Sequence, residues 1–281
     1  MLRHVTLVVI VSFCAGLFLA AAMPAAGVPV VYNLLDDNSS ISVDLDGGTG
    51  INSWVVDSIT HMETQWFWYR TGAMTDEAAI STLAITAKGE TDTNFDPSSN
   101  KDTAYVKYTD AVAGFTLELR VSLDGGAAGT DNSTLAEQIT ITNTGASNLT
   151  FHFFQYTDFN LGGTPNDDTI QIVGTLPDSI FQSDPKYDGD TVVVPKADAY
   201  EAGDATTLLN KFITSDGATT LANVAAAGPG IDVAWALQWD RIIQPGKTFQ
   251  IVIGKEIAPE PATMAMLVLG GVAMLVRRRM R

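Results

Sequence analysis

The stretch that decides the fold reads FTLELRVSL, from Phe115 to Leu123, and it places an apolar side chain at every second position. Successive side chains of a β-strand point to opposite faces of a sheet. This alternation therefore predicts a strand with one face buried in a core and the other face in water, as in an antiparallel sheet. Leu117, Leu119 and Val121 are expected to be buried, whereas Glu118 and Arg120 are expected to face solvent.

The same period of two recurs along most of the chain, interrupted by glycine, asparagine and aspartate turns such as Asp124-Gly125-Gly126. Short strands at this spacing are typical of an antiparallel sandwich or barrel, and the sandwich, with a jelly-roll-like arrangement, is the fold we predict. Two short helices are expected, at Asp76–Ala84 and Thr206–Phe212. The predicted strands are Ser40–Leu45, Trp54–Ile59, Gln65–Tyr69, Ala104–Tyr108, Phe115–Leu123, Leu135–Asn143, Leu149–Phe159, Thr169–Val173, Thr191–Val194, Val233–Trp239 and Thr248–Glu256.

The N-terminus has the layout of a secretory signal peptide, with a short basic start, an apolar run from Val5 to Ala22 and small residues after it. Cleavage is expected after Ala22 or after Gly27. We therefore divide the chain into a signal peptide at 1–27, a β-sandwich ectodomain at 28–257 and a C-terminal segment at 258–281. The only cysteine, Cys14, lies in the signal peptide, so disulfides and cysteine-ligated zinc are excluded from the mature body.

The body is strongly acidic. The chain has 16 basic and 32 acidic residues, and five of the basic residues and one acidic residue lie in the two targeting segments, which leaves a net charge of −20 on the body. Such a field repels nucleic acid and anionic membranes. The sequence therefore predicts no nucleic-acid partner and favours an exported, soluble body.

The C-terminal segment consists of Pro259-Glu260-Pro261, an apolar stretch from Ala262 to Val276, and a terminal arginine cluster. The apolar stretch is short for the hydrocarbon core but can span it if the arginines extend toward the interface. Basic residues after a span hold that end on the cytoplasmic side, so the body is expected to face outward. The stop-transfer arginines are Arg277, Arg278, Arg279 and Arg281.

This triplet, short predicted transmembrane helix and arginine cluster resemble the C-terminal sorting signal of the PEP-CTERM family, with Pro259, Glu260 and Pro261 as the sorting motif. The resemblance implies recognition by an exosortase, a membrane transpeptidase of biofilm-forming Gram-negative bacteria, after export through the Sec translocon and cleavage by signal peptidase. The alternative is a plain membrane anchor. The body contains a QWFWYR stretch at Gln65–Arg70 and a strand at Leu149–Phe159, and it resembles a functionally uncharacterised group of exported PEP-CTERM proteins.

The aromatic stretch has two interpretations. In strand geometry Trp66 and Trp68 share one face, while Phe67 and Tyr69 share the other. If the strand is covered on both sides, all four rings belong to the core, which is the interpretation we prefer. If one pair is exposed, Trp66, Trp68 and Tyr69 are candidates for an aromatic platform that binds sugar rings.

Metal and catalytic motifs are weaker. Asp184, Asp188 and Asp190 form a carboxylate-glycine cluster of the kind that calcium loops use, but the register and the closing glutamate of such a loop are missing. No cofactor is therefore expected, with calcium as the alternative. His61 and His152 do not form a ligand pair. A pair of carboxylates for glycoside hydrolysis can lie far apart in sequence, and the candidates are Glu63, Glu118, Glu137 and Asp158.

These observations favour an exported, non-enzymatic structural protein of the cell surface or extracellular matrix, held in the inner membrane as a sorting intermediate. A glycan-binding module of the extracellular polysaccharide is the first alternative. An enzyme that acts on this polysaccharide is the second.

Overall fold

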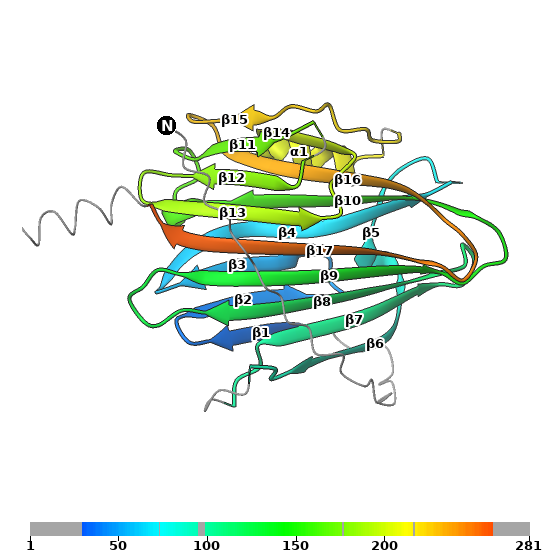
Figure 1. Cartoon of the computed structure of the whole chain (residues 1–281), viewed down its shortest axis with the longest axis horizontal. Coiled ribbons are helices and arrows are strands. Elements are labelled where there is room, and N and C mark those ends of the chain that lie inside the picture. The colour runs from blue at the N-terminus through cyan, green and yellow to red at the C-terminus, as the bar shows by residue number, and fades with distance from the viewer. Residues whose placement is uncertain (1–29, 73, 95–98, 176, 216, 261–281) are drawn as a thin grey trace, which may run out of the picture.

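The computed structural model describes residues 30–72, 74–94, 99–175, 177–215 and 217–260. These residues form two antiparallel β-sheets that face each other, with one short helix outside them (Figure 1). The predicted all-β antiparallel sandwich is confirmed. The two sheets have separate edges, so the sandwich and not the closed barrel is the outcome.

The first sheet, sheet A, has β4 and β10 near its middle, and its strand order is β1-β2-β3-β4-β10-β16-β14, with β5 paired to β4. Residues far apart in the chain meet here, since Phe153 of β10 pairs with Tyr69 of β4 on one side and with Trp239 of β16 on the other. The strands are β1 (Val31–Asp36), β2 (Ser39–Asp44), β3 (Gly50–Val56), β4 (Ile59–Thr71), β5 (Ala78–Ala79), β10 (Leu149–Phe159), β14 (Ala199–Asp204) and β16 (Val233–Ile243).

The second sheet, sheet B, has the order β15-β11-β12-β13-β17-β9-β8-β7-β6. Its middle strand β17 is the last strand of the chain and lies between β13 and β9 (Figure 1). The strands are β6 (Ala84–Thr91), β7 (Thr103–Asp110), β8 (Phe115–Gly125), β9 (Ser133–Asn143), β11 (Thr169–Val173), β12 (Ser179–Ser183), β13 (Tyr187–Val194), β15 (Ala226–Ala227) and β17 (Thr248–Pro259).

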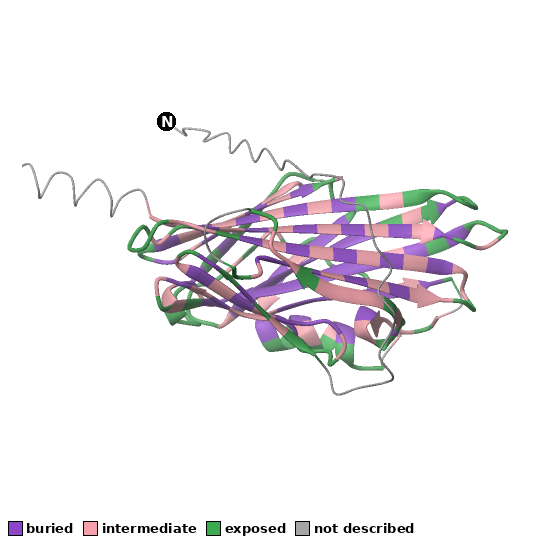
Figure 2. Ribbon diagram, turned by 90° about the horizontal axis from the view of Figure 1, so that it is seen from below, coloured by how far each residue is buried: buried purple, intermediate pink, exposed green. Residues whose placement is uncertain are grey.

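The side chains of β8 alternate between the core and the outer face as predicted. Leu117, Leu119 and Val121 are buried between the sheets, whereas Glu118 and Arg120 are partly exposed on the outer face. Figure 2 shows the same alternation of buried and partly exposed residues as bands along the long strands. The period of two in the sequence therefore marks the face of each strand that points into the core.

Two predicted elements are wrong. The strand expected at Trp54–Ile59 contains a hairpin turn, because Asp57 and Ser58 adopt positive φ values of 46° and 71° between β3 and β4. The helix expected at Asp76–Ala84 is replaced by β5, a 3₁₀ turn η1 (Ile80–Thr82) and the start of β6. Its small and apolar residues have helical propensity, but here Ala78 and Ala79 pair with β4, and tertiary pairing overrides that weak preference.

The second predicted helix is present as α1 (Ala205–Ile213). Asp204 caps its N-terminus, since its carboxylate accepts a hydrogen bond of 2.8 Å from the backbone N–H of Thr207. Leu208 and Phe212 are buried under the helix, on the outer face of sheet A. One side of this sheet is therefore covered by sheet B and part of the other side by α1.

A buried charged group joins the two sheets. Lys255 of β17 and Glu137 of β9 form a salt bridge of 2.5 Å, and the side chains of both are 0% exposed. The side-chain amide of Gln65, from β4 in the opposite sheet, donates a hydrogen bond to the same carboxylate. Burial lowers the pKa of Lys255, while the nearby Glu137 carboxylate acts in the opposite direction.

We expect Leu119→Ala to lower the free energy of unfolding by about 2 to 5 kcal/mol, because it leaves a cavity between the sheets. The adjacent Glu118→Ala should change it by about 0.5 kcal/mol or less, because the ion pair of Glu118 with Lys107 is exposed to solvent. Urea unfolding of the two variants measures the difference. Equal losses at the two positions would contradict the assignment of the buried face.

Candidate functional site

The predicted sorting motif begins inside the sandwich. Strand β17 runs to Pro259, so Ala258 and Pro259 are still paired with β13, and Glu260 donates a backbone hydrogen bond of 2.7 Å to the carbonyl of Lys186. The strand predicted at Thr248–Glu256 is therefore three residues longer in the structure, where β17 runs to Pro259. Pro261 and the stop-transfer arginines Arg277, Arg278, Arg279 and Arg281 lie outside the described residues, as do the predicted signal peptide and transmembrane helix. Among the residues that the structure describes, no helix is long and apolar enough to cross a membrane.

The aromatic cluster of β4 is buried on both faces. Trp66, Trp68 and Tyr69 are 2%, 6% and 5% exposed, and Phe67 is fully buried. Phe67 stacks on Phe153 at a centroid distance of 5.4 Å within the intersheet core. These rings therefore offer no exposed platform to a sugar in this conformation.

On the other face of β4, Trp68 stacks on Phe212 of α1 at 5.2 Å between centroids. Trp66 is covered by the backbone of Gly50, where a β-carbon would lie 2.6 Å from the indole ring and the φ value is +69°. Only glycine tolerates both this conformation and this approach. Because β4 is covered on both faces, all four aromatic side chains from Trp66 to Tyr69 are buried.

The three aspartates proposed for calcium do not converge. One oxygen of Asp184 accepts backbone hydrogen bonds from Lys186 and Tyr187 within a turn, each of 2.5 Å. Asp188 and Asp190 alternate with buried residues along β13 and so lie on the outer face of sheet B. Burial raises the pKa of each of these two to about 6, with nearby carboxylates adding to the shift. Within the described ranges, no group of three or more His, Cys, Asp or Glu side chains is arranged to hold a metal ion.

The candidate carboxylates have three different environments. Glu137 lies in the core with Lys255, and Glu118 pairs with Lys107 on the outer face of sheet B. Asp158 of β10 is 5% exposed and accepts a hydrogen bond of 3.0 Å from the hydroxyl of Tyr156. Burial raises the pKa of Asp158 to about 7, with added contributions from the charges of Asp232 and Glu63. The fourth candidate, Glu63, is exposed, and no hydrogen bond or ion pair joins it to Asp158 in the described part of the chain.

The two histidines have structural surroundings. His61 is fully buried, accepts a hydrogen bond of 3.3 Å from the N–H of Gly162 and contacts the ring of Tyr187 edge-on. Burial lowers the pKa of His61 to about 4, which keeps the ring neutral. His152 lies on the outer face of sheet A beside Asp240, at 2.5 Å.

The sequence did not single out a set of buried polar side chains beside the turn η2 (Leu161–Gly163). The side-chain amide of Gln182 donates hydrogen bonds to the carboxylate of Asp168, at 2.6 Å, and to the backbone carbonyl of Phe159. The side chains of Gln182 and Asp168 are almost fully buried. Burial raises the pKa of Asp168 to about 7. Asp168 follows the exposed Asp167 in the loop before β11, so no local signal separates the buried carboxyl group from its solvated neighbour.

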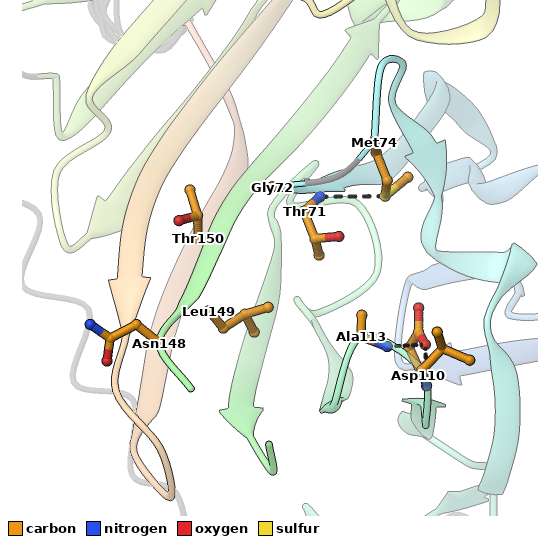
Figure 3. A pocket seen from close by; sticks show the side chains of 9 residues that line it. Thr71, Gly72, Met74, Asp110, Ala113, Asn148, Leu149 and Thr150 are labelled. Atoms are coloured by element: carbon orange, nitrogen blue, oxygen red, sulfur yellow. Dashed lines mark hydrogen bonds between the residues drawn. The ribbon is translucent and has the colours of Figure 1, made fainter. Parts of the chain in front are cut away.

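A pocket with a volume of about 460 Å³ lies where the end of β4 and the start of β10 meet the turn after β7. Figure 3 shows its lining side chains. Among the described residues that line the pocket, Asp110 alone has a titratable side chain, and its carboxylate accepts hydrogen bonds from the N–H groups of Val112 and Ala113. The lining residues are Thr71, Gly72, Met74, Asp110, Val112, Ala113, Asn148, Leu149 and Thr150.

Comparison with protein families settles what the C-terminal segment is. Residues 258–279 match the PEP-CTERM protein-sorting motif. The chain carries a PEP-CTERM sorting signal. This motif implies export, an exosortase as the processing partner and a membrane-associated sorting intermediate. The matched segment includes the last two residues of β17, so the PEP-CTERM signal and the sandwich overlap.

The body of the chain resembles solved structures. A bacterial glucoamylase in complex with acarbose aligns with a TM-score of 0.53 and 8% identity, over 90% of this chain and 37% of that one. A putative aldose 1-epimerase from Escherichia coli K12 aligns with a TM-score of 0.51 and 12% identity, over 82% of this chain and 99% of that one. At these identities the likenesses show the fold alone. No curated protein matches the sequence.

Because all five tryptophans of the chain are buried, we expect iodide to quench the fluorescence of the folded protein only weakly. Unfolding in urea should make the same rings accessible. Trp66→Ala and Trp68→Ala should each lower the free energy of unfolding by about 3 to 5 kcal/mol, since each removes a large core side chain. Strong quenching of the native protein would contradict burial of these rings and favour an exposed aromatic platform. A Trp66→Ala variant with an unchanged melting temperature would do the same.

Proposed function

We propose that this protein is a non-enzymatic structural component of the cell surface or extracellular matrix of a Gram-negative bacterium. The observation that carries the proposal is the direct continuity of β17 with the sorting motif. It makes the sandwich itself the exported cargo and leaves no linker between the two. The Sec translocon, signal peptidase and the exosortase are then the partners during delivery.

Two features of the body support a structural role. The aromatic side chains of β4 lie in the core, and the carboxyl group in the pocket of Figure 3 accepts the hydrogen bonds that close a turn. Its many acidic residues give a high negative charge, which keeps an exported β-protein soluble at high concentration.

The proposal predicts that the protein released from cells with the cognate exosortase lacks the residues from near Pro259 onward. Intact-mass measurement of the released protein tests this, with cells lacking the exosortase as the control. The control should retain the whole tail in the membrane fraction. Released protein that still ends in Arg281 would contradict sorting by this route.

A glycan-related role is the second candidate. The observation that favours it is the likeness of the fold to a glucoamylase and to a putative aldose 1-epimerase, both named for sugar chemistry. Burial raises the pKa of Asp158 to about 7, which makes it a carboxyl group that can exchange a proton near neutral pH. This role has two forms, a module that binds the extracellular polysaccharide and an enzyme that acts on it.

Incubation of the exported protein with the extracellular polysaccharide of its own organism separates these roles. On the structural proposal we expect no new reducing ends, and no difference between the wild type, Asp158→Asn and the surface control Asp178→Asn. Release of reducing ends that is lost in Asp158→Asn and kept in Asp178→Asn would establish the enzyme. Co-sedimentation without release would establish the binding module.

A further inference from the structure

The first residues of the sorting signal are part of sheet B. Asp188 pairs with Ala258 and Tyr187 with Pro259, and the N–H of Glu260 donates to the carbonyl of Lys186 at 2.7 Å. The match to the sorting motif begins at residue 258. Three residues of the signal, Ala258 to Glu260, are therefore hydrogen-bonded or paired to the folded body.

The position of Pro259 fits this pairing. In an antiparallel ladder, hydrogen-bonded and non-hydrogen-bonded pairs alternate. The bond between Glu260 and Lys186 makes that pair hydrogen-bonded, so the next pair, Pro259 with Tyr187, is non-hydrogen-bonded. Proline lacks an N–H group, and at this position the ladder needs none from it. The first proline of the triplet thus lies where it can stay in the sheet.

This end of β17 is held from one side only. Strand β9 pairs with β17 as far as Ile257, which lies opposite Ser133, the first residue of β9. Among the strands that the structure describes, β13 alone pairs with β17 beyond Ile257. Ala258, Pro259 and Glu260 are also half-exposed, whereas Ile257 and Lys255 are buried. If the strand opens from its end, we therefore expect the opening to extend no further than Ile257, which is buried and paired on both sides.

Like charges weaken the same end. Asp188 lies opposite Ala258 in the ladder. Burial raises the pKa of Asp188 to about 6, and the charges of Glu260 and Asp184 add to the shift. At neutral pH the carboxylates of Asp188 and Glu260 repel each other across the pairing that holds the motif. Few contacts, partial exposure and repulsion are the features of a segment that opens locally without unfolding the body.

We propose that the sorting signal exists in two states, docked on β13 and released from it back to Ile257, and that the exosortase reads only the released state. In the docked state the backbone of Ala258–Glu260 is engaged by residues 186–188. The end of β13 thus acts as an internal competitor for the sorting enzyme. This inference rests on sorting by the exosortase.

A reversible crosslink tests the proposal in the full-length protein. The mature body has no cysteine, so Asp188→Cys combined with Ala258→Cys introduces one pair, at opposed positions of the ladder. Opposed residues of a hydrogen-bonded pair have Cα atoms about 5.5 Å apart, which a disulfide can span. Export takes the chain into an oxidising compartment, where the bond forms.

The matched control is Asp190→Cys combined with Glu256→Cys. It is the same kind of pair on the same face of β13 and β17, but it lies before Ile257 and leaves the motif free. In cells with the exosortase, we expect the 188–258 crosslink to abolish removal of the tail, and a membrane-permeant reductant to restore it. The 190–256 crosslink should leave processing at the wild-type level.

Intact mass and a melting curve for each variant distinguish the outcomes. Wild-type protein that keeps its tail in the presence of the exosortase would refute sorting itself. Normal processing of the wild type together with normal processing of the oxidised 188–258 variant would refute only the docked state. Equal loss of processing in both crosslinked variants, with melting temperatures at or above that of the wild type, would also refute it. A Gly-Ser insertion between Ile257 and Ala258 should be processed at least as fast as the wild type, and slower processing would contradict competition by β13.

Discussion

The salt bridge between Lys255 and Glu137 is the constraint on which the arrangement of the two sheets depends. Both groups are fully buried, and Gln65 of the opposite sheet completes the contact. Loss of one partner from such a pair typically costs about 3 to 5 kcal/mol, because the other charge stays buried without compensation. Gln65 brings sheet A into contact with this pair, so a shift of one sheet over the other would remove a hydrogen bond from the buried Glu137 carboxylate. The same contact holds β17 in place at Lys255, three residues before the sorting motif begins.

A body without cysteines closes its loops with aspartates. Asp57, in the turn between β3 and β4, accepts hydrogen bonds from the N–H groups of Gly129 and Asp131, which belong to the loop before β9. Asp102 binds the N–H groups of Thr93 and Asn94 in the same manner. Many of the acidic residues are thus structural acceptors for backbone donors, which the net charge alone does not reveal.

The sorting signal gives the end of β17 a second role. In most of the sandwich, pairing on both sides of a strand serves only stability, and β17 has such pairing up to Ile257. Its last residues have a neighbour on one side only and are also the start of the motif. An exported protein with a short tail must bring its fold close to the membrane, and here the fold and the tail share residues. The stability of one strand end and the access of a membrane enzyme to its substrate are therefore coupled.

Local patterns were enough to predict the strands that alternate without interruption, the helix near Thr206–Phe212 and the sorting motif, because each depends only on residues close together in the chain. The tertiary structure decided the features that depend on pairing. It converted Asp76–Ala84 from a predicted helix into a strand and a turn, since β4 was available as a partner. It placed the charged Lys255 in the core, because Glu137 and Gln65 arrive there from other strands. It also buried Trp66 and Trp68 under Gly50 and α1, and joined Pro259 to Tyr187. Side-chain alternation is a property of one strand, whereas the neighbours of that strand are set by contacts between residues far apart in sequence, which no local pattern records.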